Sequence, residues 1–149
     1  MNLFNQTIST YSNFNFNHLA NFNGTYLGAT DTGIYVLGGS KDNGTEIDAK
    51  IKTGSIDFGD TFIKYARDVW ITHRTDGTLK LRIYVDEDST APVEKHTTIV
   101  NSNMTEERLK PPRGLRGRFY TLELRNVGGA DFDIDSLSLL VESIKRKVR

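Results

Sequence analysis

Apolar and polar residues alternate over short stretches of this 149-residue chain, and turn-forming residues separate the stretches. The alternation is clearest in residues 79–85, where one face would carry Leu79, Leu81, Ile83 and Val85 and the other Lys80, Arg82 and Tyr84. A period of two is typical of a β-strand with one buried face. Asp76-Gly77 precedes this strand and follows residues 62–72, so we predict a β-hairpin. One face of its first strand should carry Ile63, Tyr65, Arg67, Val69 and Ile71.

Further strands are predicted on both sides of that hairpin. Residues 25–39 indicate a second hairpin with its turn at residues 30–33, and residues 47–52 and 120–125 alternate as single strands. In residues 132–141 the alternation slips by one position at Asp135-Ser136. A slip of one residue exchanges the two faces, so a β-bulge or a tight bend is expected there.

The segment between these strands is more polar. Residues 97–100 are expected to form a short strand, and residues 104–109 are the only place where the sequence allows a helical turn. The resulting series of about seven to nine short strands, with almost no helix, predicts an all-β fold. The expected architecture is an antiparallel β-sandwich, jelly-roll-like, formed by residues 25–149 as a single domain.

Residues 1–24 are rich in Asn, Phe, Ser and Thr, without a sustained period, and predict an irregular N-terminal arm. The arm contains Phe4, Phe14, Phe16 and Phe22. Burying a large apolar side chain stabilises a protein by roughly 2 kcal/mol, so these rings should be covered. Either the core of their own domain or a neighbouring subunit could cover them, and the sequence leaves both alternatives open.

The amino-acid composition excludes several classes of function. The chain has no cysteine, which excludes disulfides, cysteine nucleophiles and thiolate metal sites. Nineteen basic residues balance nineteen acidic ones, so no global charge favours nucleic acid as a partner. No apolar run reaches the roughly 18 residues that span a bilayer, and the N-terminus does not resemble a secretory signal. We therefore expect synthesis in a cytoplasm and no membrane span.

Four acids recur at the ligand spacing of a calcium-binding loop: Asp131, Asp133, Asp135 and Glu142. Ser136 occupies the position where such a loop needs glycine, and no amphipathic helix flanks the segment. The acids are better explained as the solvent-facing side of a strand, with Phe132 and Ile134 facing inward. The three histidines lie far apart in sequence, and no catalytic motif is present, so neither a cofactor nor an enzymatic activity is expected.

Two kinds of binding surface remain as alternatives. Residues 108–118 are strongly basic, and we predict that Arg67, Arg113, Arg116 and Arg118 form ion pairs between strands or subunits. A carbohydrate platform could instead use Trp70, Tyr65, Tyr84 and Tyr120. Trp70 stands between Val69 and Ile71, a setting that is more typical of a packed position than of an exposed stacking face.

Three stretches carry a resemblance to a known class of proteins. They are IDAKIKTGSIDFGDTFIKYARDVWI (residues 47–71), DGTLKLRIYVDED (residues 76–88) and RGRFYTLELRNVGGADFDIDSLSLLVE (residues 116–142). Their pattern of strand and turn residues resembles the β-sandwich part of tail and virion structural proteins of tailed bacteriophages, from about Thr25 to the end of the chain. The resemblance implies a virion component, made in the bacterial host, that assembles with other virion proteins or as a homo-oligomeric ring. It offers no active-site residues to transfer. The alternative is a lectin-like module for a host-surface glycan.

Overall fold

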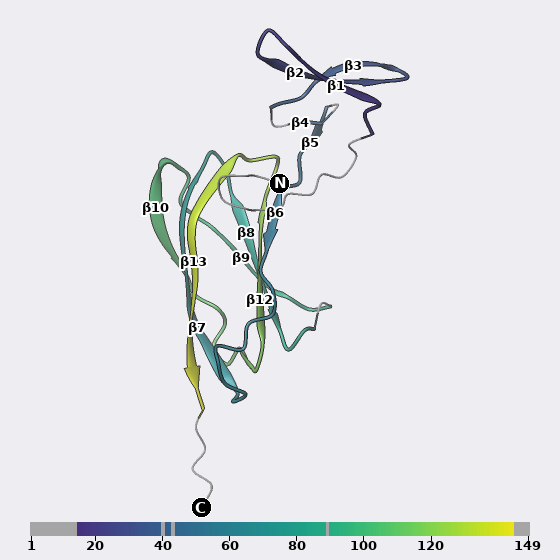
Figure 1. Ribbon diagram of the computed structural model, residues 1–149. Helices are drawn as coiled ribbons and strands as arrows, with labels where there is room; N and C mark the ends of the chain where they lie inside the picture. The colour runs from purple at the N-terminus through teal and green to yellow at the C-terminus, as the bar shows by residue number, and fades with distance from the viewer. Residues whose placement is uncertain (1–14, 40, 43, 89, 145–149) are drawn as a thin grey trace, which may run out of the picture. The chain divides into compact units, whose positions relative to one another are not determined.

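The structure of the protein is a computed structural model, and it describes residues 15–39, 41–42, 44–88 and 90–144. Every regular element in these ranges is a β-strand (Figure 1). The chain divides into two compact units, Met1–Gly39 and Ser40–Arg149. The prediction of an all-β protein is confirmed.

The first unit contains a three-stranded antiparallel sheet in the order β1-β2-β3. Its strands are β1 (His18–Phe22), β2 (Thr25–Thr30) and β3 (Gly33–Val36). The hairpin expected in residues 25–39 is confirmed, with Thr30 paired to Gly33 across its turn. β1 lies in the segment that was expected to be an irregular arm, and it pairs with β2 along its whole length. The arm prediction is therefore wrong for residues 18–22, and the first unit extends to Gly39 instead of ending at Gly24.

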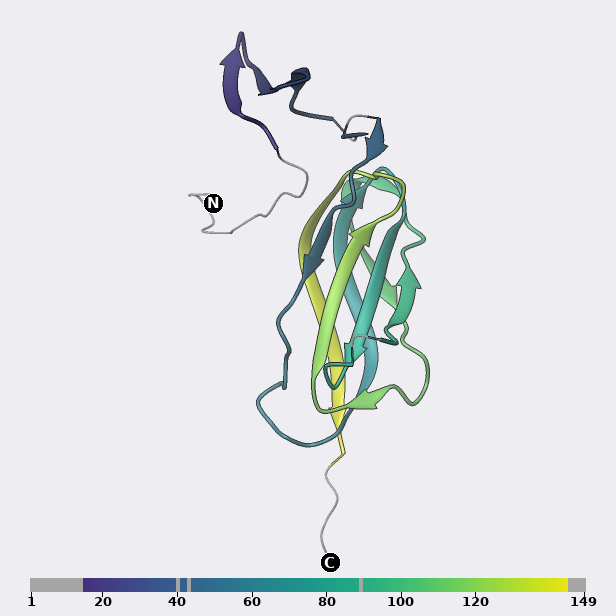
Figure 2. The same ribbon diagram turned by 90° about the vertical axis from the view of Figure 1, so that its right-hand side faces the viewer.

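The second unit contains two four-stranded antiparallel sheets that pack as a sandwich (Figures 1 and 2). β7 (Lys64–Thr75) is the centre of one sheet, with β13 (Phe132–Ser143) on one side and β10 (Asn101–Leu109) and β11 (Arg116–Gly117) on the other. The other sheet has the order β6 (Lys50–Lys52), β12 (Tyr120–Asn126), β8 (Leu79–Val85) and β9 (Val93–His96). A small ribbon of β4 (Lys41–Asp42) and β5 (Thr45–Glu46) precedes them.

Both sheets of the second unit contribute to one hydrophobic core. The β7 sheet supplies Ala66, Val69, Ile71 and Leu109, and the β12 sheet supplies Leu79, Leu81, Ile83, Tyr120, Leu122 and Leu124. The inward face predicted for residues 79–85 is confirmed. Leu79, Leu81 and Ile83 are fully buried, and Val85 packs against the same core. The sandwich is thus confirmed, and its jelly-roll form stays a prediction.

The hairpin predicted at Asp76-Gly77 is wrong. β7 and β8 belong to different sheets, so residues 76–78 carry the chain from one layer of the sandwich to the other. Gly77 does not have the positive φ that a tight hairpin turn requires. The crossing is held by the buried Thr75, whose hydroxyl group lies 3.0 Å from the carbonyl oxygens of Gly77 and Asp131 and accepts a hydrogen bond from the Gly77 amide.

Two β-bulges decide which side chains of the β7 sheet face the core. The register between β13 and β7 shifts between Ile134 and Ser136, which confirms the irregularity predicted at Asp135-Ser136. A second shift leaves Arg67 unopposed on β7, because Leu140 pairs with Asp68 and Val141 pairs with Ala66. The inward face predicted for β7 is therefore correct at Val69 and Ile71. It is wrong on the N-terminal side of Arg67, where Lys64 and Ala66 are buried and the predicted Tyr65 is not.

The structure differs from the predictions for residues 97–100 and 104–109. The strand expected at residues 97–100 is wrong, because β9 ends at His96 and Thr97 leaves the ladder while still exchanging hydrogen bonds with Leu79. The helical turn expected at residues 104–109 is also wrong, since this segment is part of β10. Residues 105–109 of β10 pair with β7, so sheet pairing overrides a weak local helical preference.

Candidate interaction surfaces

One face of the first unit is apolar and uncovered among the described residues. Paired residues of an antiparallel sheet point to the same side, so the pairing places six apolar side chains together. We define the Phe22 face by these residues: Ala20, Phe22, Leu27, Ala29, Ile34 and Val36. The same pairing places the polar residues His18 and Thr25 on this side of the sheet, next to Ala29 and Phe22. Phe22, Ile34 and Val36 expose 73%, 74% and 67% of their surface. Isolated apolar residues on a surface are ordinary, whereas a contiguous apolar sheet face indicates an interaction site.

The opposite face of the same sheet has a partial cover. Gly28 is the buried position of this face, and the ring of Phe16 lies directly over it. The Phe16 and Tyr35 rings also contact each other, with centroids 6.1 Å apart. Of the arm phenylalanines, Phe16 thus packs within its own unit and Phe22 is exposed, while Phe4 and Phe14 lie outside the described residues.

The first unit is also almost free of charge. Asp31 is the only Asp, Glu, Lys or Arg among residues 1–39, whereas such residues make up 26% of the whole chain. A partner of this unit could not be recruited by charge complementarity. Its recognition must rest on apolar packing and on hydrogen bonds of uncharged groups.

The outer face of the β7 sheet is charged and internally paired. Arg67 binds Glu142 and Arg74 binds Asp133, each pair joining β7 to β13. Asp131, Asp133, Asp135 and Glu142 are all exposed, as predicted for the solvent-facing side of a strand, while Phe132 and Ile134 pack toward the core. Within the described ranges, no group of three or more acidic or histidine residues is arranged to hold a metal ion.

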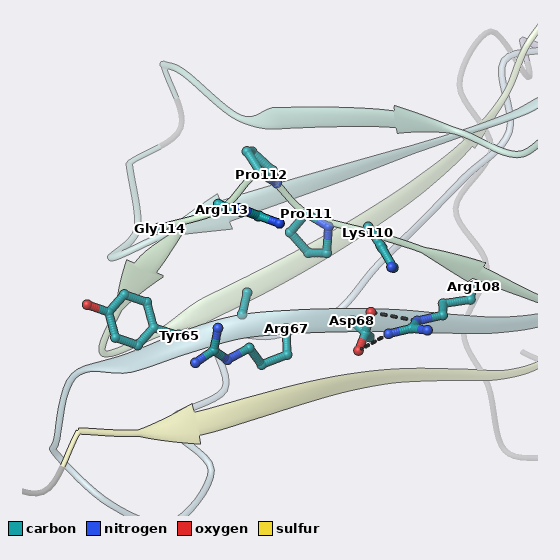
Figure 3. Close-up of a pocket in the computed structure, with 10 residues that line it drawn as sticks. Tyr65, Arg67, Asp68, Arg108, Lys110, Pro111, Pro112, Arg113 and Gly114 are labelled. Carbon is teal, nitrogen blue, oxygen red and sulfur yellow. Dashed lines mark hydrogen bonds and ion pairs between the residues drawn. The ribbon is translucent and has the colours of Figure 1, made fainter.

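A pocket of about 240 Å³ lies beside this face (Figure 3). We name it the Arg113 pocket; residues 65–68 of β7, Arg108 of β10 and the loop formed by residues 110–114 line it. The loop leaves the sheet after Leu109 and returns where the Ala66 amide donates to the Leu115 carbonyl at 3.0 Å. Of the residues that line this pocket, the sequence predicted Tyr65, Arg67 and Arg113 as candidate site residues. Asp68, Arg108 and Lys110 were not predicted, although the basic stretch of residues 108–118 was the available signal.

Asp68 and Arg108 form the most ordered contact of the pocket. Nε and Nη2 of Arg108 donate to the two carboxylate oxygens of Asp68 at 2.7 and 2.8 Å, a bidentate arrangement (Figure 3). This hydrogen bonding lowers the pKa of Asp68 and raises the pKa of Arg108. The guanidinium group of Arg108 also lies 5.5 Å from the ring centroid of Trp70. Trp70 is 36% exposed on the outer face, which corrects the expectation of a packed position.

The other carbohydrate candidates separate into two groups. Tyr120 and Tyr84 are buried, and their hydroxyl groups donate to the Lys64 carbonyl at 2.7 Å and to Glu123 at 3.3 Å. Neither ring can therefore stack on a ligand, which removes both from the predicted platform. Tyr65 is half-buried at the Arg113 pocket, with the guanidinium group of Arg67 5.4 Å from its ring centroid.

Arg116 and Arg118 lie outside the pocket. Their side chains and that of Arg113 are exposed, and none has an ion-pair partner among the described residues. The Arg118 backbone amide donates to Asp86 at 2.6 Å, which anchors the strand end and leaves the guanidinium group unused. Of the four arginines predicted to form ion pairs, only Arg67 has one within the described chain, and it joins two strands of the same sheet.

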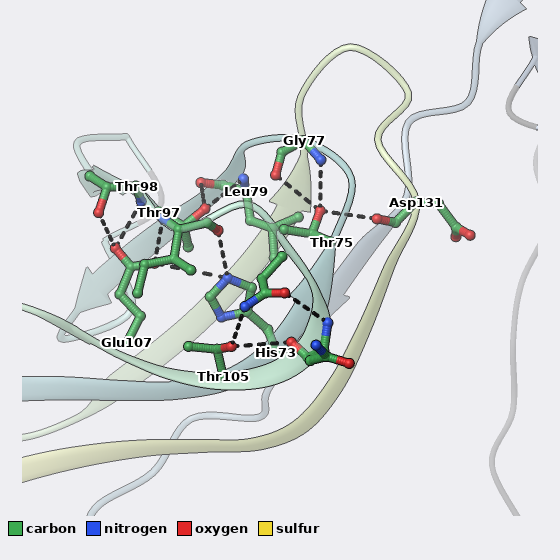
Figure 4. A network of polar contacts seen from close by, with 12 residues as sticks. His73, Thr75, Gly77, Leu79, Thr97, Thr98, Thr105, Glu107 and Asp131 are labelled. Carbon is green, nitrogen blue, oxygen red and sulfur yellow. Dashed lines mark hydrogen bonds and ion pairs between the residues drawn. The ribbon is translucent and has the colours of Figure 1, made fainter.

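His73 and Glu107 are buried, and they belong to a network of polar contacts that holds the segment between β9 and β10 (Figure 4). Glu107 accepts hydrogen bonds from the amide and hydroxyl groups of Thr98, both at 2.8 Å, and from the Ile99 amide at 3.2 Å. His73 Nε2 lies 3.2 Å from the Ile99 carbonyl. These contacts tie the segment between β9 and β10 to the sheet, in the place where the backbone has left the ladder.

Comparison of the chain with protein-family models, with curated proteins and with solved structures found no match. No helix able to cross a membrane occurs in the part of the chain that the structure describes.

Proposed function

We propose that this chain is a structural, non-enzymatic subunit that assembles with further copies of itself, and that it belongs to the virion of a tailed bacteriophage. The Phe22 face of one copy packs on the Phe22 face of a second copy. The virion part of the proposal is supported by the sequence resemblance of residues 47–71, 76–88 and 116–142. Other virion proteins are then further partners, and the cytoplasm of the bacterial host is the place of synthesis.

The observation that carries self-assembly is the exposure of Phe22, Ile34 and Val36 on a sheet with little core of its own. A sheet of this size gains stability only when an apolar face is covered. Two such faces can pack about 10 Å apart, as the layers of a sandwich do. A second copy fits the chemistry of this face, because the near absence of charge in residues 1–39 favours an equally apolar surface. A symmetric contact of one patch with itself is also the commonest form of homo-oligomer contact.

The test is the mass of the full-length chain in solution, measured by light scattering over a range of concentrations. The variant Phe22→Lys with Ile34→Lys places two charges in the Phe22 face. The matched control, Leu19→Lys with Tyr26→Lys, places two charges at residues of similar exposure on the opposite face. We expect an oligomer for the unmodified chain and for the control, and a monomer for the Phe22-face variant.

Two results would overturn the assignment of this face. The first is a monomeric unmodified chain at every concentration; if the Phe22-face variant also destabilises that monomer, the face is covered by its own chain. The second is equal dissociation of both double variants, which would indicate a general effect of added charge.

A further inference from the structure

The Arg113 pocket contains an excess of positive charge that the described chain does not neutralise. Four cations line it, namely Arg67, Arg108, Lys110 and Arg113. Arg108 is paired with Asp68, and Arg67 is paired with Glu142. Lys110 and Arg113 are exposed and have no ion-pair partner within the described ranges. Two uncompensated cations on one short loop favour a ligand with a negative charge.

Asp68 restricts the kind of anion that the pocket accepts. Each of its oxygens accepts one hydrogen bond from Arg108, which leaves further lone pairs on both oxygens. Those lone pairs can accept hydrogen bonds from hydroxyl groups. A phosphate dianion has only one hydroxyl group to donate and places its other oxygens beside this carboxylate, so it meets the hydrogen-bonding capacity of Asp68 less well. A ligand with one negative charge and several hydroxyl groups satisfies both the cations and Asp68.

The loop that lines the pocket has a restricted backbone conformation. Pro111 and Pro112 have restricted backbone angles, and Gly114 adopts a φ of 88° that other residues rarely tolerate. The loop closes on itself where the Leu115 amide donates to the Pro112 carbonyl at 3.2 Å. Tyr65, Pro111 and Pro112 line the pocket, and their rings can offer apolar surface to carbon-bound hydrogens.

We propose that the Arg113 pocket binds a saccharide that carries a single carboxylate, of the uronic-acid type. Lys110 and Arg113 bind the carboxylate, Asp68 accepts hydrogen bonds from sugar hydroxyl groups, and Tyr65 and the prolines contact the apolar edge of the sugar ring. The site lies within the second unit and does not depend on the assembly proposed above.

The test is a titration of the isotopically labelled full-length chain by nuclear magnetic resonance, with glucuronate as the probe. Glucose, acetate and inorganic phosphate are the comparison ligands, because each lacks part of the required chemistry. We expect shifts of the pocket amides with glucuronate, and weaker or no binding of the other three. The variant Lys110→Gln with Arg113→Gln should weaken glucuronate binding roughly tenfold or more, as expected for the loss of charge-assisted hydrogen bonds.

The matched control is Arg116→Gln with Arg118→Gln, which removes the same charge from exposed residues outside the pocket and should bind glucuronate unchanged. Equal binding of acetate and glucuronate would overturn the sugar assignment, and tighter binding of phosphate would overturn the role of Asp68. No shift of the pocket amides with glucuronate, or equal loss in both double variants, would overturn the site itself.

Discussion

The ammonium group of Lys64 is fully buried and lies 2.7 Å from a carboxylate oxygen of Asp60. It also donates to the backbone carbonyls of Asp60 and Phe62, at 2.8 and 3.0 Å. An ammonium group has three donors, and all three are therefore used. These contacts fix the turn that leads into β7. The buried Lys64 is therefore fully paired, and we call its contacts with Asp60 and Phe62 the Lys64 clamp.

We predict that Lys64→Met destabilises the protein by about 2 kcal/mol, because two backbone carbonyls lose a charged donor. Methionine retains most of the apolar stem, so the loss reports the hydrogen bonds more than the packing. The measurement is urea unfolding at neutral pH. Lys50→Met is the control, since Lys50 is exposed and has no ion pair in the described chain, and it should change stability little.

The same variant has a second consequence at acid pH. The hydrogen bond from Lys64 lowers the pKa of Asp60 from its ordinary value of 3.8, so ionised Asp60 stabilises the folded state above that pH and loses this effect as the pH falls. In Lys64→Met the pKa of Asp60 should rise toward 3.8, which nuclear magnetic resonance can follow. An unchanged Asp60 titration would contradict the clamp.

The sequence predicted the strands better than their connections. Alternation located β8, β12 and β13 because each has one face on the core, and the parity slip identified the bulge at Asp135. The bulge at Arg67 was not visible, because Lys64 enters the core where a polar residue is not expected. Asp76-Gly77 predicted a hairpin from local turn preference, but the contacts that make it a crossing come from Asp131, far along the chain.

Gly28 allows the first unit to pack Phe16. A Cβ atom at residue 28 would lie between 2.5 and 2.7 Å from three carbons of the Phe16 ring. We predict that Gly28→Ala displaces this ring, at a loss of roughly 1–3 kcal/mol as for other overpacked sites. Aromatic proton spectra should show a changed environment for Phe16 and Tyr35. Gly33→Ala is the control, because nothing lies within 4 Å of a Cβ atom there, and it should leave both rings unchanged.

The candidate sites were only partly predictable, for physical reasons. β1 was missed because its short sequence alternates weakly, although Asn23-Gly24, with φ angles of 49° and 82°, is a strong hairpin signal. The Arg113 pocket joins β7 to a loop about 45 residues later, and a single sequence does not reveal such a pairing. Tyr84 and Tyr120 looked equivalent to Trp70 in sequence. Tyr120 lies in the core, whereas Tyr84 is on the side of Lys80 and Arg82 and is covered there by neighbours such as Lys52, whose ammonium group lies 4.7 Å from its ring centroid.

Tyr120 should make the stability of the protein fall at alkaline pH. Burial raises the pKa of its phenol above the ordinary value of 10.0, so above pH 10 the unfolded chain releases a proton that the folded chain retains. Its contribution to stability is therefore complete below pH 10 and is lost as the pH rises, with a limiting slope of about 1.4 kcal/mol per pH unit. Tyr120→Phe also loses the hydrogen bond to the Lys64 carbonyl, so it should be less stable at pH 7, by about 1 kcal/mol. Urea unfolding between pH 7 and 11 should show this deficit shrinking above pH 10, and a constant deficit across the range would contradict the buried phenol as its cause.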